Sequence, residues 1–475
     1  MNRLTTLRGH ALGEHPAVGN APLTGALTFG IVAGTLGLVI GASLLAASSL
    51  PALALLVPGA LVAAAFLALG LIRPGLALGL LPLIAATVPL SVGTGTGSRI
   101  VAALAVAAFL IVAVVARALL RHDLRMASSP VLAPTVALAL AWVMAFLYSD
   151  AVHSPLVWTW DISLLPRIGQ LAVVLISAGT LVMALNLGRD LRWVKVATWS
   201  LILLSLPAFA ADVFRIKQLD AVISSGGLFT MWVVALACGQ ALYNTSLPRW
   251  TRLALGGLTA AWMYKAFIMQ AAWFSGWMPA VVAIAVIIFF RSRWAFLVLT
   301  LMAFAYAATH YDQLYAILWQ SQVDEGDLSR LSIWSQAGDL IRRYPLLGTG
   351  PAGYAAYYMT LYLGSSFSMS SHSNYVDVVL QTGIIGTVVF AWFLISLLLV
   401  GWRARRTWRS DFGGGFAQGA FGGLVGVIVA MALGDWFIPF VYNQTIAGFR
   451  YTVHSWVFLG FLASLAASHP TSEEP

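Results

Sequence analysis

Long apolar runs separated by short polar segments form the pattern of this sequence from end to end. Most runs are about 20 residues long, which is the length an α-helix needs to cross the hydrocarbon core of a bilayer. They are continuous and do not alternate in period two, as the strands of a membrane β-barrel would. The pattern therefore predicts an all-α, polytopic helical membrane protein with about 14 transmembrane helices.

The predicted spans divide the chain into five parts. These are a cytoplasmic N-terminal tail at 1–22, transmembrane helices 1–11 within 23–309, a large periplasmic loop at 310–375, transmembrane helices 12–14 within 376–467, and a cytoplasmic C-terminal tail at 468–475. The individual spans are predicted at 23–47, 51–71, 75–91, 98–118, 131–148, 167–187, 192–211, 227–246, 252–268, 277–290, 294–309, 376–401, 414–435 and 447–467. No internal repeat of the kind found in inverted-repeat transporters is visible.

Composition agrees with a membrane location. The chain has 475 residues, of which 60% are hydrophobic and only 9% charged, against roughly 25% charged in soluble proteins. The single cysteine, Cys238, lies in an apolar run and excludes an internal disulfide. Residues 1–20 show no removable signal peptide, so we expect the first span to direct insertion.

The distribution of charge predicts the orientation in the membrane, because short cytoplasmic loops hold the excess of Lys and Arg. With the N-terminus inside, the inner segments hold 17 basic and six acidic residues, and the outer segments hold nine basic and 11 acidic residues. The inner side is then about +11 and the outer side about −2, which together give the formal net charge of +9. The basic excess is thus a sign of topology and not of nucleic-acid binding. Both termini are predicted to be cytoplasmic, and the 310–375 loop periplasmic.

Nine basic residues fall on the predicted outer side, against the general bias. They are Arg99, Arg167, Arg215, Lys217, Lys265, Arg330, Arg342, Arg343 and Arg450. Ionisable groups near membrane depth are costly and are functional candidates by default. The alternative is that some of them lie among lipid headgroups or pair with acidic residues, for which the candidates are Asp161, Asp212, Asp220, Asp339 and Asp435.

The 310–375 loop begins with a predicted amphipathic helix at 329–343. Leu331, Trp334 and Ile341 share one face at spacings of three and four, and arginines lie elsewhere. One interpretation is an interfacial helix anchored in the membrane by Trp334. The other adds that its arginines face a negatively charged lipid headgroup, because a guanidinium grips phosphate oxygens bidentately. Tyr344-Pro345 ends the helix, and the glycine-rich turn that follows allows close backbone approach.

The loop ends with Ser370-Ser371-His372-Ser373-Asn374-Tyr375, immediately before an apolar span. Ser371 or Ser373 is a plausible N-cap for that helix. His372 then lies at the positive end of the helix dipole, which disfavours the imidazolium form. A neutral histidine is a competent general base, although a lone histidine is more often structural.

Together these motifs resemble the O-antigen ligase and polymerase family of bacterial inner-membrane glycosyltransferases, which are GT-C-like and mostly helical. The resemblance follows the order Arg330, Trp334, Pro345 to Gly350, His372 to Tyr375, and Gln381-Thr382-Gly383-Ile384-Ile385-Gly386. It covers about 60 residues in detail, and the layout of many spans with one large late loop extends it along the chain.

The resemblance implies an inverting transfer of a glycan from an undecaprenyl-diphosphate carrier to an acceptor hydroxyl, with no metal or other cofactor. The acceptor would be a glycan or lipid A core. Carried over by position, His372 is the catalytic base and Arg330 contributes to the basic face of the loop. The predicted contacts to diphosphate or glycan are Arg342, Arg343, Asn374 and Tyr375. Arginines that stabilise the diphosphate leaving group would replace the electrophilic assistance of a metal.

The sequence departs from the family at one turn. The family often carries a Ser-Arg-Gly-like turn at the outer end of an earlier helix, whose arginine helps to hold the diphosphate. The corresponding segment here reads Phe274-Ser275-Gly276-Trp277-Met278-Pro279 and has no arginine. Lys265 on the preceding helix, or Arg215 in the 212–226 loop, is predicted to supply that charge.

Several alternatives stay open at the level of sequence. Within the family, the chain is either a polymerase, which about 14 spans favour, or a ligase. A flippase for lipid-linked oligosaccharides would also carry outward arginines, but it needs no long loop that ends in a histidine. A metal-dependent GT-C transferase is a third alternative, because Asp324, Glu325 and Asp327 are suitable ligands for Mg²⁺ or Mn²⁺. A solvated acidic loop is the simpler interpretation of that cluster.

Overall fold

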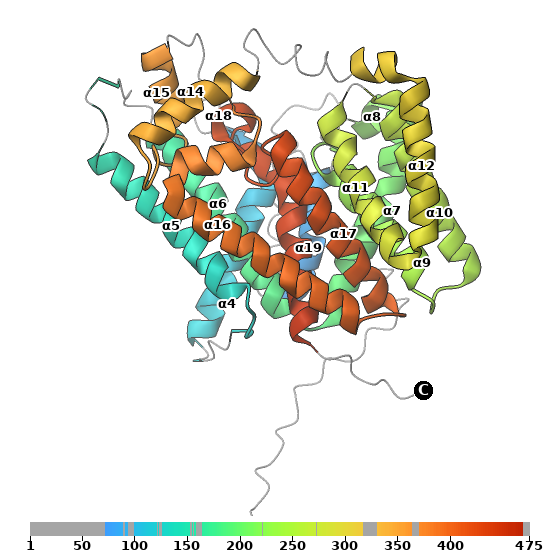
Figure 1. Cartoon of the computed structure of the whole chain (residues 1–475). Coiled ribbons are helices and arrows are strands. Elements are labelled where there is room, and N and C mark those ends of the chain that lie inside the picture. The colour runs from blue at the N-terminus through green and yellow to red at the C-terminus, as the bar shows by residue number, and fades with distance from the viewer. Residues whose placement is uncertain are drawn as a thin grey trace, which may run out of the picture.

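A computed structural model describes residues 72–468 of the chain, apart from 89–90, 94–98, 121, 123–125, 153, 155, 158–163, 221, 272, 317–329 and 363–369. Within these residues the chain is mostly helical (Figure 1). The helices are α3 (Pro74–Thr87), α4 (Ala102–Leu120), α5 (Leu132–Ala151), α6 (Leu164–Leu187), α7 (Leu191–Phe214), α8 (Lys217–Asp220), α9 (Phe229–Tyr243), α10 (Arg249–Tyr264), the π-helix η2 (Lys265–Met269), α11 (Phe274–Arg291), α12 (Arg293–Thr309), α14 (Arg330–Arg343), α15 (Tyr354–Tyr362), α16 (Asn374–Thr407), α17 (Phe412–Leu433), α18 (Val441–Gln444), the 3-10 helix η3 (Ile446–Gly448) and α19 (Phe449–Ala467).

The predicted spans can be compared with these helices one by one. Each of the 12 spans predicted beyond residue 72 coincides with a helix, and the first two, at 23–47 and 51–71, lie outside the described residues. Seven described helices are long and apolar enough to cross a membrane, namely α4, α5, α6, α7, α11, α16 and α17. The shorter helices α3, α9 and α12 are also apolar. The helical membrane class is confirmed, whereas the total of 14 spans and the periplasmic loop remain predictions.

A small β-hairpin departs from the all-α prediction. β1 (Ser91–Gly93) pairs antiparallel with β2 (Arg99–Val101), with Ser91 opposite Val101 and Gly93 opposite Arg99. The hairpin connects α3 to α4, and its pairing satisfies backbone groups that an open loop would leave to solvent. Strands of three residues are too short to produce a recognisable alternation of apolar and polar positions.

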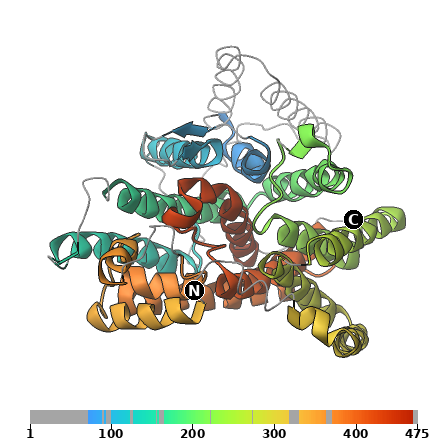
Figure 2. The same cartoon turned by 90° about the horizontal axis from the view of Figure 1, so that it is seen from above.

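The core forms where α17 packs on α9 and α11, and where α19 packs on α6 and α3. Figure 2 shows α19 near the centre of the bundle, with other helices around it. Glycines on α17 allow very close contact: a Cβ at Gly419 would lie 2.7 Å from the Ala235 carbonyl oxygen of α9. At Gly422 it would lie 2.8 Å from the Ala283 carbonyl oxygen of α11. Small residues at helix interfaces are typical of membrane bundles.

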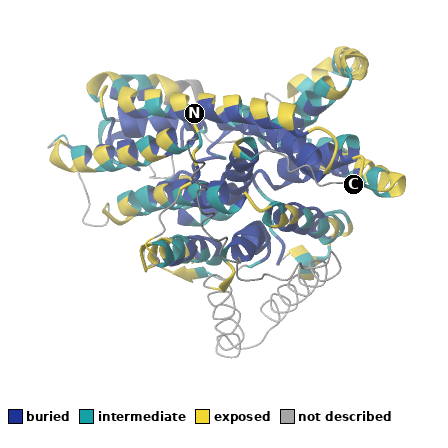
Figure 3. Ribbon diagram, turned by 90° about the horizontal axis from the view of Figure 1, so that it is seen from below, coloured by how far each residue is buried: buried dark blue, intermediate teal, exposed yellow. Residues whose placement is uncertain are grey.

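The outward faces of the bundle are apolar. Figure 3 shows exposed residues along the outer sides of the helices and buried ones between them. No residue of α12 is buried, and its Met302 and Phe304 are 62% and 74% exposed. A soluble protein rarely leaves such a surface to water, whereas lipid covers it without cost. The amphipathic helix α14 and the short helix α15 lie across one end of the bundle (Figure 1), the end predicted to be periplasmic.

Candidate functional site

The glycine-rich turn after α14 packs directly against a break in α16. Thr349 and Gly350 donate backbone hydrogen bonds to the carbonyls of Leu380 and Gln381, at 2.8 and 3.1 Å. In return, the backbone N–H of Ile384 donates to the carbonyl of Pro345 at 2.8 Å. Two motifs that are separate in the sequence thus form one unit. The glycines of the two motifs allow the two backbones to approach each other closely.

Gly383 is the residue that makes this contact possible. Its φ of 63° and ψ of −162° interrupt the helical geometry of α16, in a region that only glycine occupies without strain. A Cβ at this position would also collide with the carbonyl of Leu346. The break in the helix therefore depends on the absence of a side chain.

Replacement of Gly383 by alanine is expected to destabilise the protein, by about 1–3 kcal/mol from backbone strain alone. Thermal unfolding in detergent, followed by tryptophan fluorescence, measures the effect as a lower midpoint. The matched control is Gly257→Ala on α10, where an added Cβ meets no atom within 4 Å and alanine favours the helix. Equal midpoints for the two variants would contradict this role of Gly383.

His372 stands two residues before the start of α16, as predicted. Its φ of 51° is left-handed, and its backbone N–H donates to the Ser370 hydroxyl at 3.0 Å. Ser373 occupies the N-cap position but makes no capping bond through its side chain. The neighbouring Trp334 of α14 donates from its indole nitrogen to the Ser371 carbonyl at 2.9 Å. Trp334, interpreted from the sequence as a membrane anchor, thus supports the His372 loop.

A buried carboxylate, Asp435, lies beyond the end of α17 and faces the same region. Its Oδ2 accepts from the backbone N–H of Phe440 at 3.0 Å, and its Oδ1 accepts from the side-chain amide of Asn443 at 3.2 Å. Burial raises the pKa of Asp435, whereas the Phe440 hydrogen bond and the charge of His372 lower it.

His372 and Asp435 line one cavity of about 400 Å³. Its walls come from five places: the loop before α9, the turn before α11, the His372 loop, the segment from α17 to α18, and the first turn of α19. Trp273, immediately before α11, and Ser275, in its first turn, both line the cavity, and Trp273 packs edge-to-face on Trp436 with ring centroids 5.8 Å apart. Ser275 belongs to the segment that lacks the expected arginine, so this segment does lie beside His372.

Lys265 lies close to this cavity, but it is already paired. Its side chain is 3% exposed and forms an ion pair with Asp212, while the ammonium lies 4.4 Å from the centroid of the Trp262 ring. Asp212 also accepts from the hydroxyl of Ser225 at 3.0 Å, one residue before the cavity-lining Gly226. Asp212 therefore neutralises much of the charge that Lys265 was predicted to provide.

Arg450 is a second basic residue beside the cavity, at the start of α19. Its guanidinium carbon lies 5.1 Å from the ring centroid of Tyr451, which lines the cavity. Its Nε is buried and has no hydrogen-bond partner among the described residues. Sequence reasoning counted Arg450 among the outward basic residues but gave it no role.

Three of the other predicted arginines, Arg215, Arg342 and Arg343, do not line the cavity. Arg215 is exposed at the C-terminus of α7. Arg342 is exposed and pairs with Asp339 at 3.1 Å, and Arg343 is exposed beside it. Arg330 begins α14, and its side chain lies outside the described part of the chain. Their roles with the substrate remain predictions.

Asn374 and Tyr375 follow His372 in the predicted motif and hold its surroundings together. Asn374 is fully buried: its amide nitrogen donates to the Ile438 carbonyl at 2.7 Å, and its oxygen accepts from the backbone N–H of Phe437 at 2.9 Å. The Tyr375 hydroxyl donates to the Ile428 carbonyl of α17 at 2.8 Å. In this structure both residues tie the start of α16 to α17 and to the segment that carries Asp435.

Beneath the loop lies a second acidic group, Asp377. It is buried in the first turn of α16 and accepts hydrogen bonds from the hydroxyls of Tyr354 and Ser371, both at 2.8 Å. Burial and the nearby Asp377 raise the pKa of Tyr354 well above its ordinary value, so the phenol stays a donor. These contacts join α15 to the His372 loop.

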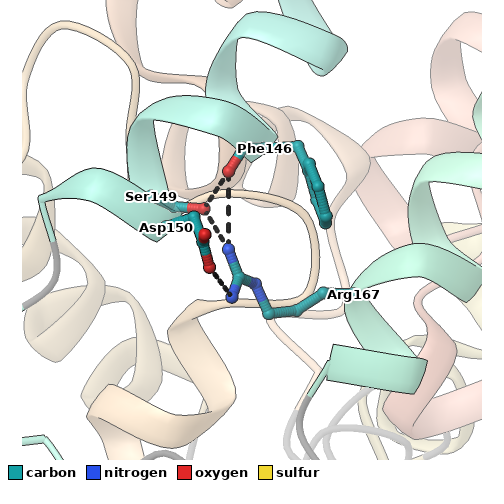
Figure 4. Close-up of polar contacts among 4 residues, drawn as sticks. All are labelled: Phe146, Ser149, Asp150 and Arg167. Carbon is teal, nitrogen blue, oxygen red and sulfur yellow. Dashed lines mark hydrogen bonds and ion pairs between the residues drawn. The ribbon is translucent and has the colours of Figure 1, made fainter.

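Arg167, another of the outward basic residues, fastens α6 to α5 (Figure 4). Its guanidinium donates to the Ser149 hydroxyl at 2.7 Å and pairs with Asp150 at 3.3 Å. It also lies over the ring of Phe146, 5.1 Å from the centroid. The alternative of paired basic residues is thus confirmed for Lys265 and Arg342 with two of the predicted acids, and Arg167 pairs with an acid that was not predicted.

The acidic cluster of Asp324, Glu325 and Asp327 lies outside the described residues. Within the described part of the chain, no three His, Cys, Asp or Glu side chains are gathered where they could hold a metal ion. The single cysteine, Cys238, is buried in α9.

Comparison with known proteins bears on the segment that holds much of this site. Residues 253–391, from α10 into the first half of α16, match the family described as O-antigen ligase. No curated protein matches the chain. The match includes the turn at Ser275, the glycine-rich turn and His372, which carried the resemblance in the sequence. This match confirms the resemblance that the sequence motifs indicated: residues 253–391 are similar to the O-antigen ligase family of membrane glycan-transfer enzymes.

Proposed function

We propose that this protein is a bacterial inner-membrane glycosyltransferase that moves a glycan from an undecaprenyl-diphosphate carrier to an acceptor hydroxyl. The observation that supports the proposal most directly is the shared cavity of His372 and Asp435, at the end of the bundle covered by α14 and α15. This cavity adjoins the segment that matches the O-antigen ligase family. The charge distribution favours a periplasmic location for it and cytoplasmic termini.

In the proposed step, an imidazole nitrogen of His372 takes the proton of the acceptor hydroxyl while the hydroxyl oxygen attacks the anomeric carbon of the donor sugar. The bond from that carbon to the diphosphate oxygen breaks, and the diphosphate leaves with the electron pair. Attack opposite the leaving group inverts the anomeric centre. Asp435 is the positioning residue that compensates the positive charge gained by His372.

The departing diphosphate needs positive charge beside the cavity. Arg450 suits this role better than Lys265, because its Nε has no partner among the described residues, whereas Lys265 is held by Asp212. A guanidinium can stabilise the growing charge on diphosphate oxygens without a metal. Arg330, Arg342, Arg343 and Arg215 are proposed to act earlier, in attracting the anionic headgroup to this face.

The direct test is transfer by the purified protein in detergent with a synthetic undecaprenyl-diphosphate oligosaccharide. A product on lipid A core identifies a ligase, and an extended lipid-linked glycan formed without lipid A core identifies a polymerase. Nuclear magnetic resonance of the product should show the inverted anomer. Absence of any product with both acceptors would overturn the proposed reaction.

The same assay with EDTA distinguishes the metal-free mechanism from its alternative. We expect the rate to change by less than about twofold, because in the proposed step the protein's own cations stabilise the leaving group. A loss of activity that Mg²⁺ or Mn²⁺ restores would favour a metal-dependent transferase that uses Asp324, Glu325 and Asp327.

A further inference from the structure

A second cavity, of about 580 Å³, opens at the opposite end of the bundle. We call it the arginine pocket, because Arg291, Arg293, Arg405, Arg406 and Arg409 all line it. It lies where the C-terminal ends of α9, α11 and α16 meet the beginnings of α12 and α17. The helix α16 connects the two sites, since it begins beside His372 and carries two of these arginines, Arg405 and Arg406, at its far end (Figure 1).

The two cavities are separated by roughly the thickness of a membrane. From Asn374 to Arg405, α16 spans about 45 Å at 1.5 Å per residue, and a hydrocarbon core is about 30 Å thick. The arginine pocket therefore lies on the face opposite His372, which the charge distribution predicts to be cytoplasmic. The proposed transfer reaction makes no use of it.

The charge in the arginine pocket is uncompensated. The described residues that line it include no Asp or Glu, and none of its five arginines forms a salt bridge with a described acidic residue. Cytoplasmic arginines at helix C-termini are common, both for topology and for the helix dipole. Such arginines usually spread into solvent or lipid headgroups, however, whereas five like charges around one hollow repel each other unless an anion joins them.

The arginines are also held in place rather than free. Arg405 stacks on Phe290, with its guanidinium carbon 3.4 Å from the ring centroid, and its Nε donates to Gln418 at 3.3 Å. The guanidinium of Arg406 lies 5.3 Å from the centroid of the Trp402 ring. Stacking restrains these long side chains before a ligand arrives, which reduces the entropy lost on binding.

We propose that the arginine pocket binds a ligand that carries two phosphate groups. Guanidinium groups bind phosphate oxygens bidentately, and Tyr243, Phe290 and Trp402 give the same hollow an aromatic wall for a less polar part of the ligand. Basic pockets between membrane helices on the cytoplasmic side are known to bind anionic lipid headgroups. The same chemistry would suit a soluble diphosphate, so the experiment has to separate these two sources.

The test compares three forms of the full-length protein in nanodiscs. The pocket variant combines Arg291→Gln, Arg293→Gln and Arg406→Gln, all exposed residues whose loss leaves the Arg405 stack intact. The control variant combines Arg189→Gln, Arg249→Gln and Arg403→Gln, which are exposed, are predicted to lie on the same side and do not line the pocket. Both variants lose three positive charges, so a general electrostatic effect would alter them equally.

Two measurements identify the source of the phosphate. In the first, the protein is released from nanodiscs of mixed lipids, and native mass spectrometry counts the cardiolipin molecules that it retains in comparison with phosphatidylcholine. In the second, inorganic pyrophosphate is titrated into the protein in phosphatidylcholine nanodiscs and its binding is measured by calorimetry at an ionic strength of about 0.15 M. We expect the wild type and the control to agree within twofold, and the pocket variant to bind at least tenfold more weakly in one of the two measurements. Loss in the first identifies a lipid headgroup, and loss in the second a soluble diphosphate. Equal behaviour of the two variants, or no binding by the wild type, would overturn the proposal.

Discussion

Replacement of His372 is expected to reduce glycan transfer by about 10²–10⁴-fold, the usual contribution of a general base. The side chain lines the cavity together with Asp435. In the proposed transfer, His372 is the group that removes the acceptor proton. In the proposed complex, the diphosphate and the glycan hold the donor, so the loss should appear in kcat, with KM for the donor changing little. Initial rates of the purified variant, with the donor at saturation, measure it.

The conformation of His372 determines which substitutions are informative. Its φ of 51° disfavours alanine, so His372→Ala combines loss of the base with backbone strain. Asparagine tolerates the left-handed region well, and His372→Asn therefore isolates the chemistry. The matched control is His310→Ala: His310 is the residue that follows α12 and stacks on Tyr306 with ring centroids 4.2 Å apart, and it does not line the cavity. A His372→Asn protein with normal thermal stability and more than half of the wild-type rate would remove His372 from the mechanism.

The hydrophobic spans and the His372 loop could both be predicted from the sequence, because each is determined by a local pattern of residues. The helix predicted at 329–343 is α14, and the span predicted at 376–401 lies within α16. Apolar length and periodicity determine such elements. The same reasoning could not predict what the apolar face of α14 contacts, because apolar side chains pack equally well against protein and against lipid. Trp334 accordingly supports Ser371, which the periodicity alone did not indicate.

Contacts between distant segments were beyond the reach of sequence patterns. The glycine-rich turn and the Gly383 motif were both identified in the sequence. Only the fold shows that the backbone of the turn packs directly on the break in α16 at Gly383. Asp435 follows α17, far from His372 in the sequence, and was considered only as a partner for an outward basic residue. Asn374 and the Phe437–Ile438 backbone bring the two together. The same limit applies to the predicted arginines, because their charge alone did not indicate which of them lie near the cavity.

Replacement of Asp435 by asparagine should lower the transfer rate by about 10–100-fold, the second largest effect that we expect. Asparagine keeps the shape of the side chain and its oxygen can still accept from Phe440, while the amide of Asn443 can turn to accept from the new nitrogen. The substitution therefore removes a charge and leaves the packing in place. What is lost is the carboxylate that compensates the positive charge of His372 when the histidine takes the acceptor proton.

The pH dependence of the rate separates this role from a structural one. The proposed role needs Asp435 as a carboxylate, and burial raises the pKa of this carboxyl, so the rate of the wild type should fall on the acid side as Asp435 takes up a proton. Asp435→Asn lacks this titrating group, so the acid limb of its profile should move to lower pH while the plateau falls. Asp435→Glu should recover part of the plateau, and Asp339→Asn on the exposed face of α14 should leave both features unchanged. A profile of Asp435→Asn that falls in height without moving along the pH axis would make Asp435 a residue of the fold alone, because a loss of packing lowers the rate equally at every pH.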